Sequence, residues 1–153
     1  MMGTKDEMPM TKYEKLMNEV HESDVMYVET ESEKIPAQAF RIEDDFCIFF
    51  NESAFETDAE RLVALDHEKS HCDTGTLYSA DAPRVTKMRC EAKAWKRTIE
   101  NLLPFNDEFV EAFNSCKLID GFDIYEFAEK LDVTPNLAIR AIEYHYYAKG
   151  KRW

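Results

Sequence analysis

The sequence predicts an α+β fold, in which a short antiparallel sheet packs on a helix and the C-terminal part is helical. Residues 38–50 form two apolar arms around an acidic turn, which is typical of a β-hairpin. Several apolar stripes with three- and four-residue spacing follow helix-capping residues, which is typical of amphipathic helices. With 153 residues, 44% of them hydrophobic, the chain has enough apolar material to bury one core.

We expect a single compact domain in three parts. Residues 1–10 are predicted to be a flexible N-terminus, residues 11–104 the core that carries the site described below, and residues 105–153 a helical segment packed on that core. The chain contains no internal repeat, linker or low-complexity segment that would divide it further.

The first elements are short. Apolar residues recur at helical spacing from Thr11 to about His21, and residues 24–30 have the composition of a strand. The hairpin that follows has arms at 38–42 and 46–50. Its second arm is apolar throughout, so we expect this arm to be buried on both faces or to have a covered edge.

Two longer helices come next. Thr57 and Glu60 have the spacing of a capping box, and the helix they open is expected to run to about Cys72, with Gly75 as its stop. Asp81 and Pro83 are expected to open a second helix that ends near Pro104. Its apolar stripe consists of Val85, Met88, Ala92, Trp95, Ile99 and Leu102.

The last third is predicted to be helical. Asn106 is expected to cap a short helix through Phe113. Asp123 and Glu126 have a spacing similar to that of a capping box, which predicts another helix start. Thr134 as N-cap, followed by Pro135 in the first helical position, predicts a final helix to about Tyr147.

The charge distribution limits the classes of partner. Residues 1–60 carry 16 acidic and 5 basic side chains, a net of -11, whereas residues 61–153 carry 15 and 14, a net of -1. Such a surface repels a phosphate backbone, so sequence-independent binding to nucleic acid is disfavoured. The acidic surface either solubilises the chain or meets partners with basic faces.

The compartment is predicted from what the sequence lacks. No stretch approaches the roughly 20 apolar residues of a membrane helix, and the N-terminus does not have the pattern of a signal peptide. We therefore expect a cytoplasmic protein. Its four cysteines form no CxxC pair and are expected to be reduced thiols rather than a disulfide framework: Cys47, Cys72, Cys90 and Cys116.

The strongest motif is His67-Glu68-Lys69-Ser70-His71, an HExxH pentapeptide on the predicted capped helix. Residues four apart share a helix face, so the imidazoles of His67 and His71 can reach one metal ion. Both continue a core-facing apolar row, where an unpaired polar group is costly. The alternative is that the two histidines are hydrogen-bonded core residues without a metal.

A third ligand is expected downstream, because catalytic zinc sites commonly use three protein ligands, such as two His and one Glu. Glu91 borders the apolar stripe of the second helix, and a carboxylate there needs neutralising. Glu100 is the reserve candidate. Asp73 lies too near the helix end, and Asp81 is better placed as a cap. The alternative for Glu91 is a surface pair with Lys87.

These ligands give Glu68 a defined role. Beside the first histidine, Glu68 is predicted to be the general base that takes a proton from the attacking water and returns it to the leaving amine. An oxyanion donor is also needed, and Tyr78, just past this helix, is the candidate. The alternative for Tyr78 is an aromatic residue packed in a loop.

Taken together, three segments resemble the ImmA/IrrE family of metallopeptidases: His67 to Gly75, Glu91-x-x-Ala94, and Ile99 to Pro104. The likeness extends over about residues 11–147 and is greatest to the short phage and mobile-element members. It implies a zincin-like fold and Zn²⁺ held by His67, His71 and Glu91. The sequence departs from the family at Lys69-Ser70, where an apolar residue and Gly are usual.

The resemblance also implies an activity: cleavage or inactivation of a cognate helix-turn-helix repressor. The alternative is a zinc-containing antirepressor that sequesters its partner without cutting it. The segment from Tyr125 to Tyr147 itself looks like a helix-turn-helix. The segment from Leu118 to Trp153, however, contains six acidic and five basic residues, so direct DNA binding is not expected.

Overall fold

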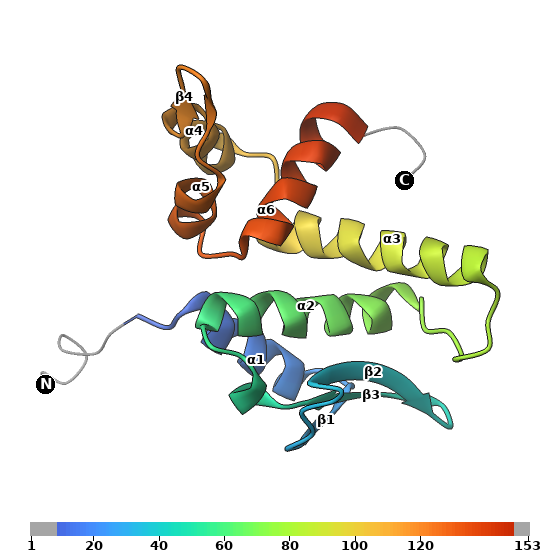
Figure 1. Cartoon of the computed structure of the whole chain (residues 1–153). Coiled ribbons are helices and arrows are strands. Elements are labelled where there is room, and N and C mark those ends of the chain that lie inside the picture. The colour runs from blue at the N-terminus through green and yellow to red at the C-terminus, as the bar shows by residue number, and fades with distance from the viewer. Residues whose placement is uncertain (1–8, 149–153) are drawn as a thin grey trace, which may run out of the picture.

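The computed structural model describes residues 9–148 (Figure 1). Most of the predicted flexible N-terminus and the basic tail at 149–153 lie outside these residues. The described chain has α+β architecture, as predicted, with six α-helices and a three-stranded sheet among residues 9–148. Helix α2 lies in the middle, with the sheet on one side and α3 on the other (Figure 1).

The N-terminal third builds the sheet. Helix α1 (Lys12–Glu22) begins with a capping box formed by Thr11 and Glu14. Strands β2 (Ala37–Ile42) and β3 (Asp45–Phe50) form the predicted antiparallel hairpin. Strand β1 (Met26–Glu29) pairs with the other edge of β3, giving the order β1-β3-β2.

The predicted antiparallel pairing is confirmed for β2 and β3, whereas β1 runs parallel to β3. The apolar composition of β3 gives the physical reason: a hairpin alone would leave one edge of β3 open, and β1 covers it. Strand β3 is therefore the central strand, and Cys47, Ile48 and Phe50 are fully buried. The expectation that this arm is covered is confirmed, while β2 is left at the edge of the sheet.

Helix α2 (Asp58–Thr74) follows a single 3₁₀ turn, η2 (Glu52–Ala54). Both hydrogen bonds of the predicted capping box between Thr57 and Glu60 are present. The helix ends at Gly75, whose φ of 66° lies in the left-handed region that favours glycine. These local signals fix both ends of the helix that carries the HExxH motif.

Helix α3 (Arg84–Leu102) corrects two predictions. Its N-cap residue is Pro83, and Asp81 instead accepts a hydrogen bond from the Ser79 hydroxyl at 2.6 Å. Of the predicted apolar stripe, only Ile99 is buried; Ala92, Trp95 and Leu102 are half-buried, and Val85 and Met88 are each 57% exposed. The start of α3 runs past the end of α2 and has less of the molecule to pack against (Figure 1).

The C-terminal part is helical, as predicted. Asn106, Asp123 and Thr134 each cap a helix through the side chain, and the helices are α4 (Asp107–Ser115), α5 (Ile124–Lys130) and α6 (Pro135–Ile142). Helix α6 continues as a π-helical segment, η3 (Glu143–Ala148). A small hairpin between α4 and α5 was not predicted; its strands are β4 (Lys117–Leu118) and β5 (Gly121–Phe122), too short to show a periodic pattern.

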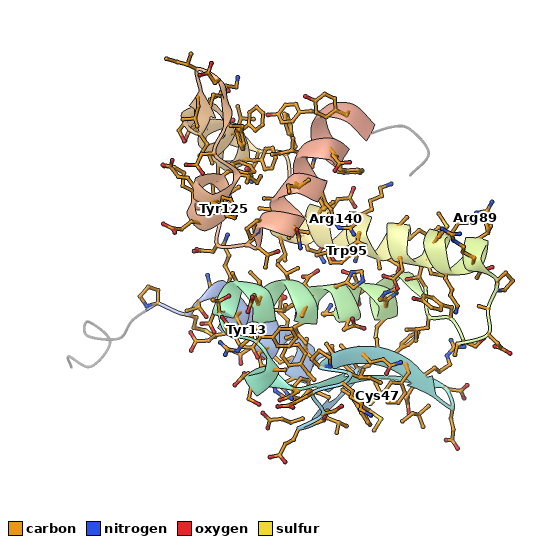
Figure 2. The ribbon with its side chains drawn as sticks, viewed as in Figure 1. Tyr13, Cys47, Arg89, Trp95, Tyr125 and Arg140 are labelled. Atoms are coloured by element: carbon orange, nitrogen blue, oxygen red, sulfur yellow. The ribbon has the colours of Figure 1, made fainter. Side chains whose placement is uncertain are left out.

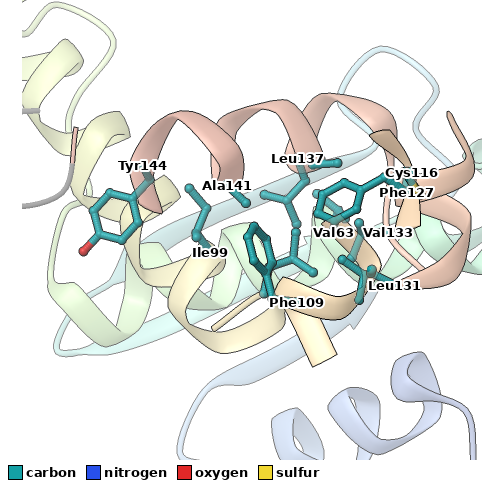
Figure 3. Close-up of a cluster of buried hydrophobic side chains, with 14 residues drawn as sticks. Val63, Ile99, Phe109, Cys116, Phe127, Leu131, Val133, Leu137, Ala141 and Tyr144 are labelled. Carbon is teal, nitrogen blue, oxygen red and sulfur yellow. The ribbon is translucent and has the colours of Figure 1, made fainter. Parts of the chain in front are cut away.

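Two hydrophobic clusters form the core. One joins α1 and the sheet to α2 through residues such as Leu16, Phe50 and Leu65. The other joins the C-terminal helices to α2 and α3 (Figure 3). Its fully buried members include Ile99, Phe109, Phe127 and Leu137, and α2 contributes Val63. Because α2 contributes to both clusters, its orientation is fixed from two sides.

Helices α2 and α3 are also joined by a buried polar network. The Ser70 hydroxyl, which is completely buried, donates to Asp66 Oδ1 at 3.1 Å and accepts from the Thr98 hydroxyl at 3.1 Å. The Asn101 amide donates to the same Asp66 oxygen at 3.3 Å. Ser70 thus connects the helix of the motif to α3, and the neighbouring Lys69 forms an ion pair with Asp73 at 2.9 Å.

Asp66 is expected to make stability depend on pH. Burial raises the pKa of its carboxyl from 3.8 to about 6, although hydrogen bonds from Asn101, Ser70 and Thr98 act in the opposite direction. A raised folded-state pKa means that stability is lost as the pH rises through 4 to 6. Asp66→Asn removes this ionisation. The free energy of unfolding of this variant, relative to that of the parent chain, should therefore be about 3 kcal/mol higher at pH 7 than at pH 4.

Urea unfolding of the metal-free protein at the two pH values measures this gain. Asp120→Asn, at an exposed position in the β4–β5 turn, is the matched control and should show no such change. A difference between Asp66→Asn and the parent chain that is the same at both pH values would contradict the prediction.

Candidate metal centre

The three predicted ligands meet between α2 and α3. His67 and His71 lie one turn apart on α2, and both are buried at the face that meets α3. Glu91 lies on α3, seven residues after Arg84 begins that helix. The packing of α2 against α3, fixed by the two clusters and the polar network, therefore brings together residues that are 20 or more positions apart in the chain.

The distances within this cluster are short. His67 Nε2 lies 2.9 Å from Glu91 Oε1, and His71 Nε2 lies 3.1 Å from Glu91 Oε2. One candidate ligand atom from each residue lies within 4.8 Å of the other two. Two imidazole nitrogens and a carboxylate thus converge on one point, and this group of three could hold a metal ion.

Glu68 lies beside the cluster, against the edge strand. Its Oε1 accepts a hydrogen bond of 2.7 Å from the backbone N–H of Ala39 in β2. This contact fixes the direction of the carboxylate, and no sequence signal predicts it because the two residues are 29 positions apart. Burial raises the pKa of the Glu68 carboxyl to about 7, although the hydrogen bond from Ala39 and the charge of His71 oppose this shift.

The ionisation of the cluster is asymmetric. Burial lowers the pKa of His67 despite its hydrogen bond with Glu91. Burial also acts against the charged form of His71, but the hydrogen bond with Glu91 and the charges of Glu91 and Glu68 outweigh it and raise the pKa. Hydrogen bonds from both imidazoles hold the pKa of the Glu91 carboxyl far below its usual range. The surroundings of the cluster therefore shift the pKa values of the two histidines in opposite directions.

The structure brings Tyr78 to the cluster as well. The Tyr78 hydroxyl donates to Glu91 Oε2 at 2.7 Å, and this hydrogen bond together with burial raises the pKa of the phenol to about 12. In this arrangement Tyr78 orients the carboxylate of Glu91, and its predicted role as an oxyanion donor stays a prediction. The side chain is 38% exposed, so Tyr78 also forms part of the rim.

The other acidic candidates lie elsewhere. Glu100 accepts a hydrogen bond of 2.9 Å from the Tyr144 hydroxyl, away from the histidines. Asp73 pairs with Lys69, and Asp81 with Ser79. The alternative in which Glu91 pairs with Lys87 does not occur, because the Lys87 ammonium donates to the carbonyl of Ala80 at 2.6 Å.

The two histidines are held by different means. His71 Nδ1 contacts Thr76 just after α2, lying 3.0 Å from the carbonyl oxygen and 3.1 Å from the hydroxyl. Donation to that carbonyl leaves Nε2 free of its proton to bind a metal. His67 Nδ1 is buried and has no hydrogen-bond partner among residues 9–148. Its ring instead stacks on Trp95, with the ring centroids 3.8 Å apart.

The ring of Trp95 in turn makes a cation–π contact. The guanidinium of Arg140, on α6, lies 4.5 Å from the centroid of the Trp95 ring, and Figure 2 shows the two side chains close together. A stack of Arg140, Trp95 and His67 thus links the C-terminal helices to the cluster. Periodicity predicts only that Trp95 lies on the apolar face of its helix, because the stack depends on tertiary packing that periodicity cannot reveal.

We expect Trp95 to position His67 for metal binding. Trp95→Ala should weaken zinc affinity by about 10- to 100-fold, the usual effect of removing the group that orients a ligating histidine. Trp95→Phe, which keeps a stacking ring, should lose much less. Competition with a chromophoric chelator measures both affinities. Equal affinity of Trp95→Ala and the parent chain would show that the stack does not hold the ring.

A cavity opens over the cluster. It has a volume of about 420 Å³ and is lined by residues of the edge strand, of α2 and of the loop after α2, together with Glu91. In the antiparallel pair Ala39 lies opposite Ile48, yet its N–H points away from β3, to Glu68. The free edge of β2 therefore faces the same cavity as the three candidate ligands.

Comparisons with protein-family models, with curated proteins and with solved structures give no match to this chain. The resemblance to the ImmA/IrrE family therefore stays a prediction. All four cysteines are free thiols, as predicted. Within residues 9–148, every helix is too short or too polar to cross a lipid bilayer.

Proposed function

We propose that this chain is a zinc-dependent endopeptidase with His67, His71 and Glu91 as the metal ligands. The convergence of these three side chains on one point is the observation that carries the proposal. The edge strand, the HExxH helix and the second ligand-bearing helix around that point favour a zincin-like fold.

The donor set fits zinc. Two imidazoles and one carboxylate are a recognised ligand set for catalytic zinc, which leaves a fourth position open. Zinc bonds of about 2.0–2.2 Å put neighbouring ligand atoms about 3.3 Å apart in a tetrahedral site. The observed distances of 2.9 and 3.1 Å between imidazole nitrogens and carboxylate oxygens need only a small adjustment to reach that spacing. The contact of His71 with Thr76 supports the tautomer that binding requires.

When bound, zinc supplies a Lewis acid and acidifies a coordinated water towards neutral pH. Glu68 is the proton carrier: its carboxylate accepts a proton from the attacking water and returns it to the amine of the leaving peptide. The hydrogen bond from Ala39 orients this carboxylate in the cavity. Tyr78, at the rim, is the proposed donor to the developing oxyanion once its hydroxyl leaves Glu91.

The free edge of β2 supports a peptide as the substrate. An extended segment can add to an exposed sheet edge through main-chain hydrogen bonds, and this mode of recognition needs no particular side-chain sequence. On β2 such a segment would lie in the cavity of about 420 Å³ that contains Glu68 and the three candidate ligands. We propose an unfolded or locally opened region of a protein as the substrate class.

The resemblance to the ImmA/IrrE family suggests a particular substrate, a helix-turn-helix repressor of a phage or mobile element, in the cytoplasm. The direct test incubates the full chain and zinc with a helix-turn-helix repressor, taken from the neighbouring gene if that gene encodes one, with and without a chelator. Zinc-dependent appearance of discrete fragments by mass spectrometry supports the proposal. Tight binding without fragments would instead identify the antirepressor that sequesters its partner.

A further inference from the structure

A second and larger hollow lies beside the cluster of His67, His71 and Glu91, with Trp95 at the boundary between them. It has a volume of about 1430 Å³ and runs between the start of α2 and helices α5 and α6. We call it the α2–α6 groove. None of its lining residues lines the cavity over the metal cluster. The proposed peptidase activity does not account for this groove.

The groove has an apolar base with exposed rings and side chains at its rim. Trp95 and Val63 line it, as do Phe55, Tyr125 and Ile139. Tyr125 is 74% exposed and Ile139 is 44% exposed, although each is apolar over most of its surface. Figure 2 shows Tyr125 on α5, the helix next to the one that carries Arg140. Large apolar groups that stay in water beside a concave surface are typical of interaction sites.

The charged side chains around this base are mostly negative. Among residues 9–148, Arg140 contributes the one guanidinium that lines the groove, and this group already lies over the ring of Trp95. The same part of the chain contributes five carboxylates to the lining: Glu56, Glu60, Glu129, Asp132 and Glu143. Of these, Glu60 is engaged in the capping box of α2, whereas Glu56, Glu129, Asp132 and Glu143 are exposed.

We propose that the α2–α6 groove docks an amphipathic, lysine- and arginine-rich segment of a partner protein. Apolar side chains of that segment would cover the ring of Tyr125 and the side chain of Ile139, and its cations would meet the carboxylates at the rim. A second copy of this chain is a poor occupant, because its net charge of -12 repels the acidic rim. The proposal holds whether or not the partner is cleaved.

Trp95 gives a direct signal for occupancy. It lines the groove, and the only other tryptophan of the chain, Trp153, lies outside the described residues. In a Trp153→Phe background, the fluorescence of Trp95 therefore reports on this site. The same ring stacks on His67, so the measurement is made on metal-free protein to keep metal binding out of the signal.

The test uses the full chain and two synthetic peptides of about 16 residues. Both carry leucines at three- and four-residue spacing; one has lysines at all other positions, and the other has glutamates. Saturable binding of the lysine peptide with a shift of the Trp95 emission is expected, and no binding of the glutamate peptide. Glu129→Lys combined with Glu143→Lys should weaken binding by at least about tenfold.

A matched control separates the groove from the overall charge. Glu31→Lys combined with Glu33→Lys changes the net charge equally at exposed positions away from the groove, and should weaken binding by less than about threefold. Equal losses in the two double variants would overturn the proposal, because the peptide would then respond only to net charge. Binding of the lysine peptide only after residues 149–153 are removed, or only after a dimer dissociates, would show that the chain itself occupies the groove. Either result would overturn the proposal.

Discussion

Glu68→Gln is expected to slow peptide hydrolysis about 10³-fold while leaving zinc binding unchanged. The amide keeps an oxygen that can accept the hydrogen bond from Ala39, so the side chain should stay in the same place. The amide cannot accept the proton of the attacking water, so the chemical step of hydrolysis should become slower. The rate constant for cleavage and the zinc content of the same preparation are the two measurements.

Asp73→Asn is the matched control for this substitution. Asp73 is also a carboxylate on α2, but it pairs with Lys69 and does not contact the cluster. The control should cut at the rate of the parent chain. Cleavage by Glu68→Gln at the parental rate would show that another group carries the proton, and the mechanism proposed for this site would be wrong.

Local signals in the sequence predicted the helix ends well. Thr57 and Glu60, Gly75, Asn106 and Thr134 all act within four residues of themselves, so their effect does not depend on the rest of the fold. The position of the metal cluster on α2 follows from the same local information, because the spacing of two histidines on a helix face is a property of the helix.

Burial of the apolar stripe of α3 does not explain where Glu91 lies. The first half of that stripe, with Val85 and Met88, is exposed. The Glu91 side chain itself is 37% exposed. The cause of its position is the packing of α2 on α3, to which the buried network of Asp66, Ser70 and Thr98 contributes, rather than burial of the stripe.

The features that the sequence did not reveal all join distant residues. Ala39 orients Glu68, Trp95 supports His67, and Arg140 covers Trp95. The parallel pairing of β1 with β3 is of the same kind. Periodicity describes which face of one element is apolar, but it does not tell which other element meets that face.

Glu91→Ala is expected to weaken zinc affinity by more than about 100-fold, a larger loss than that from removing a group that only orients a ligand. Two imidazoles remain, but the carboxylate that balances the charge of the ion is lost. The parent chain should gain about 2.7 kcal/mol of stability at a zinc concentration 100 times its dissociation constant. Under the same conditions Glu91→Ala should show little zinc-dependent rise in its thermal midpoint.

Glu100→Ala is the matched control on the same helix, since this carboxylate meets Tyr144 instead of the histidines. It should lose some stability but keep the full response to zinc. The two variants differ in only one relevant respect, the distance of the carboxylate from His67 and His71. If both responded to zinc like the parent chain, Glu91 would not be a ligand, and the short distances within the cluster would describe an ion pair rather than a metal site.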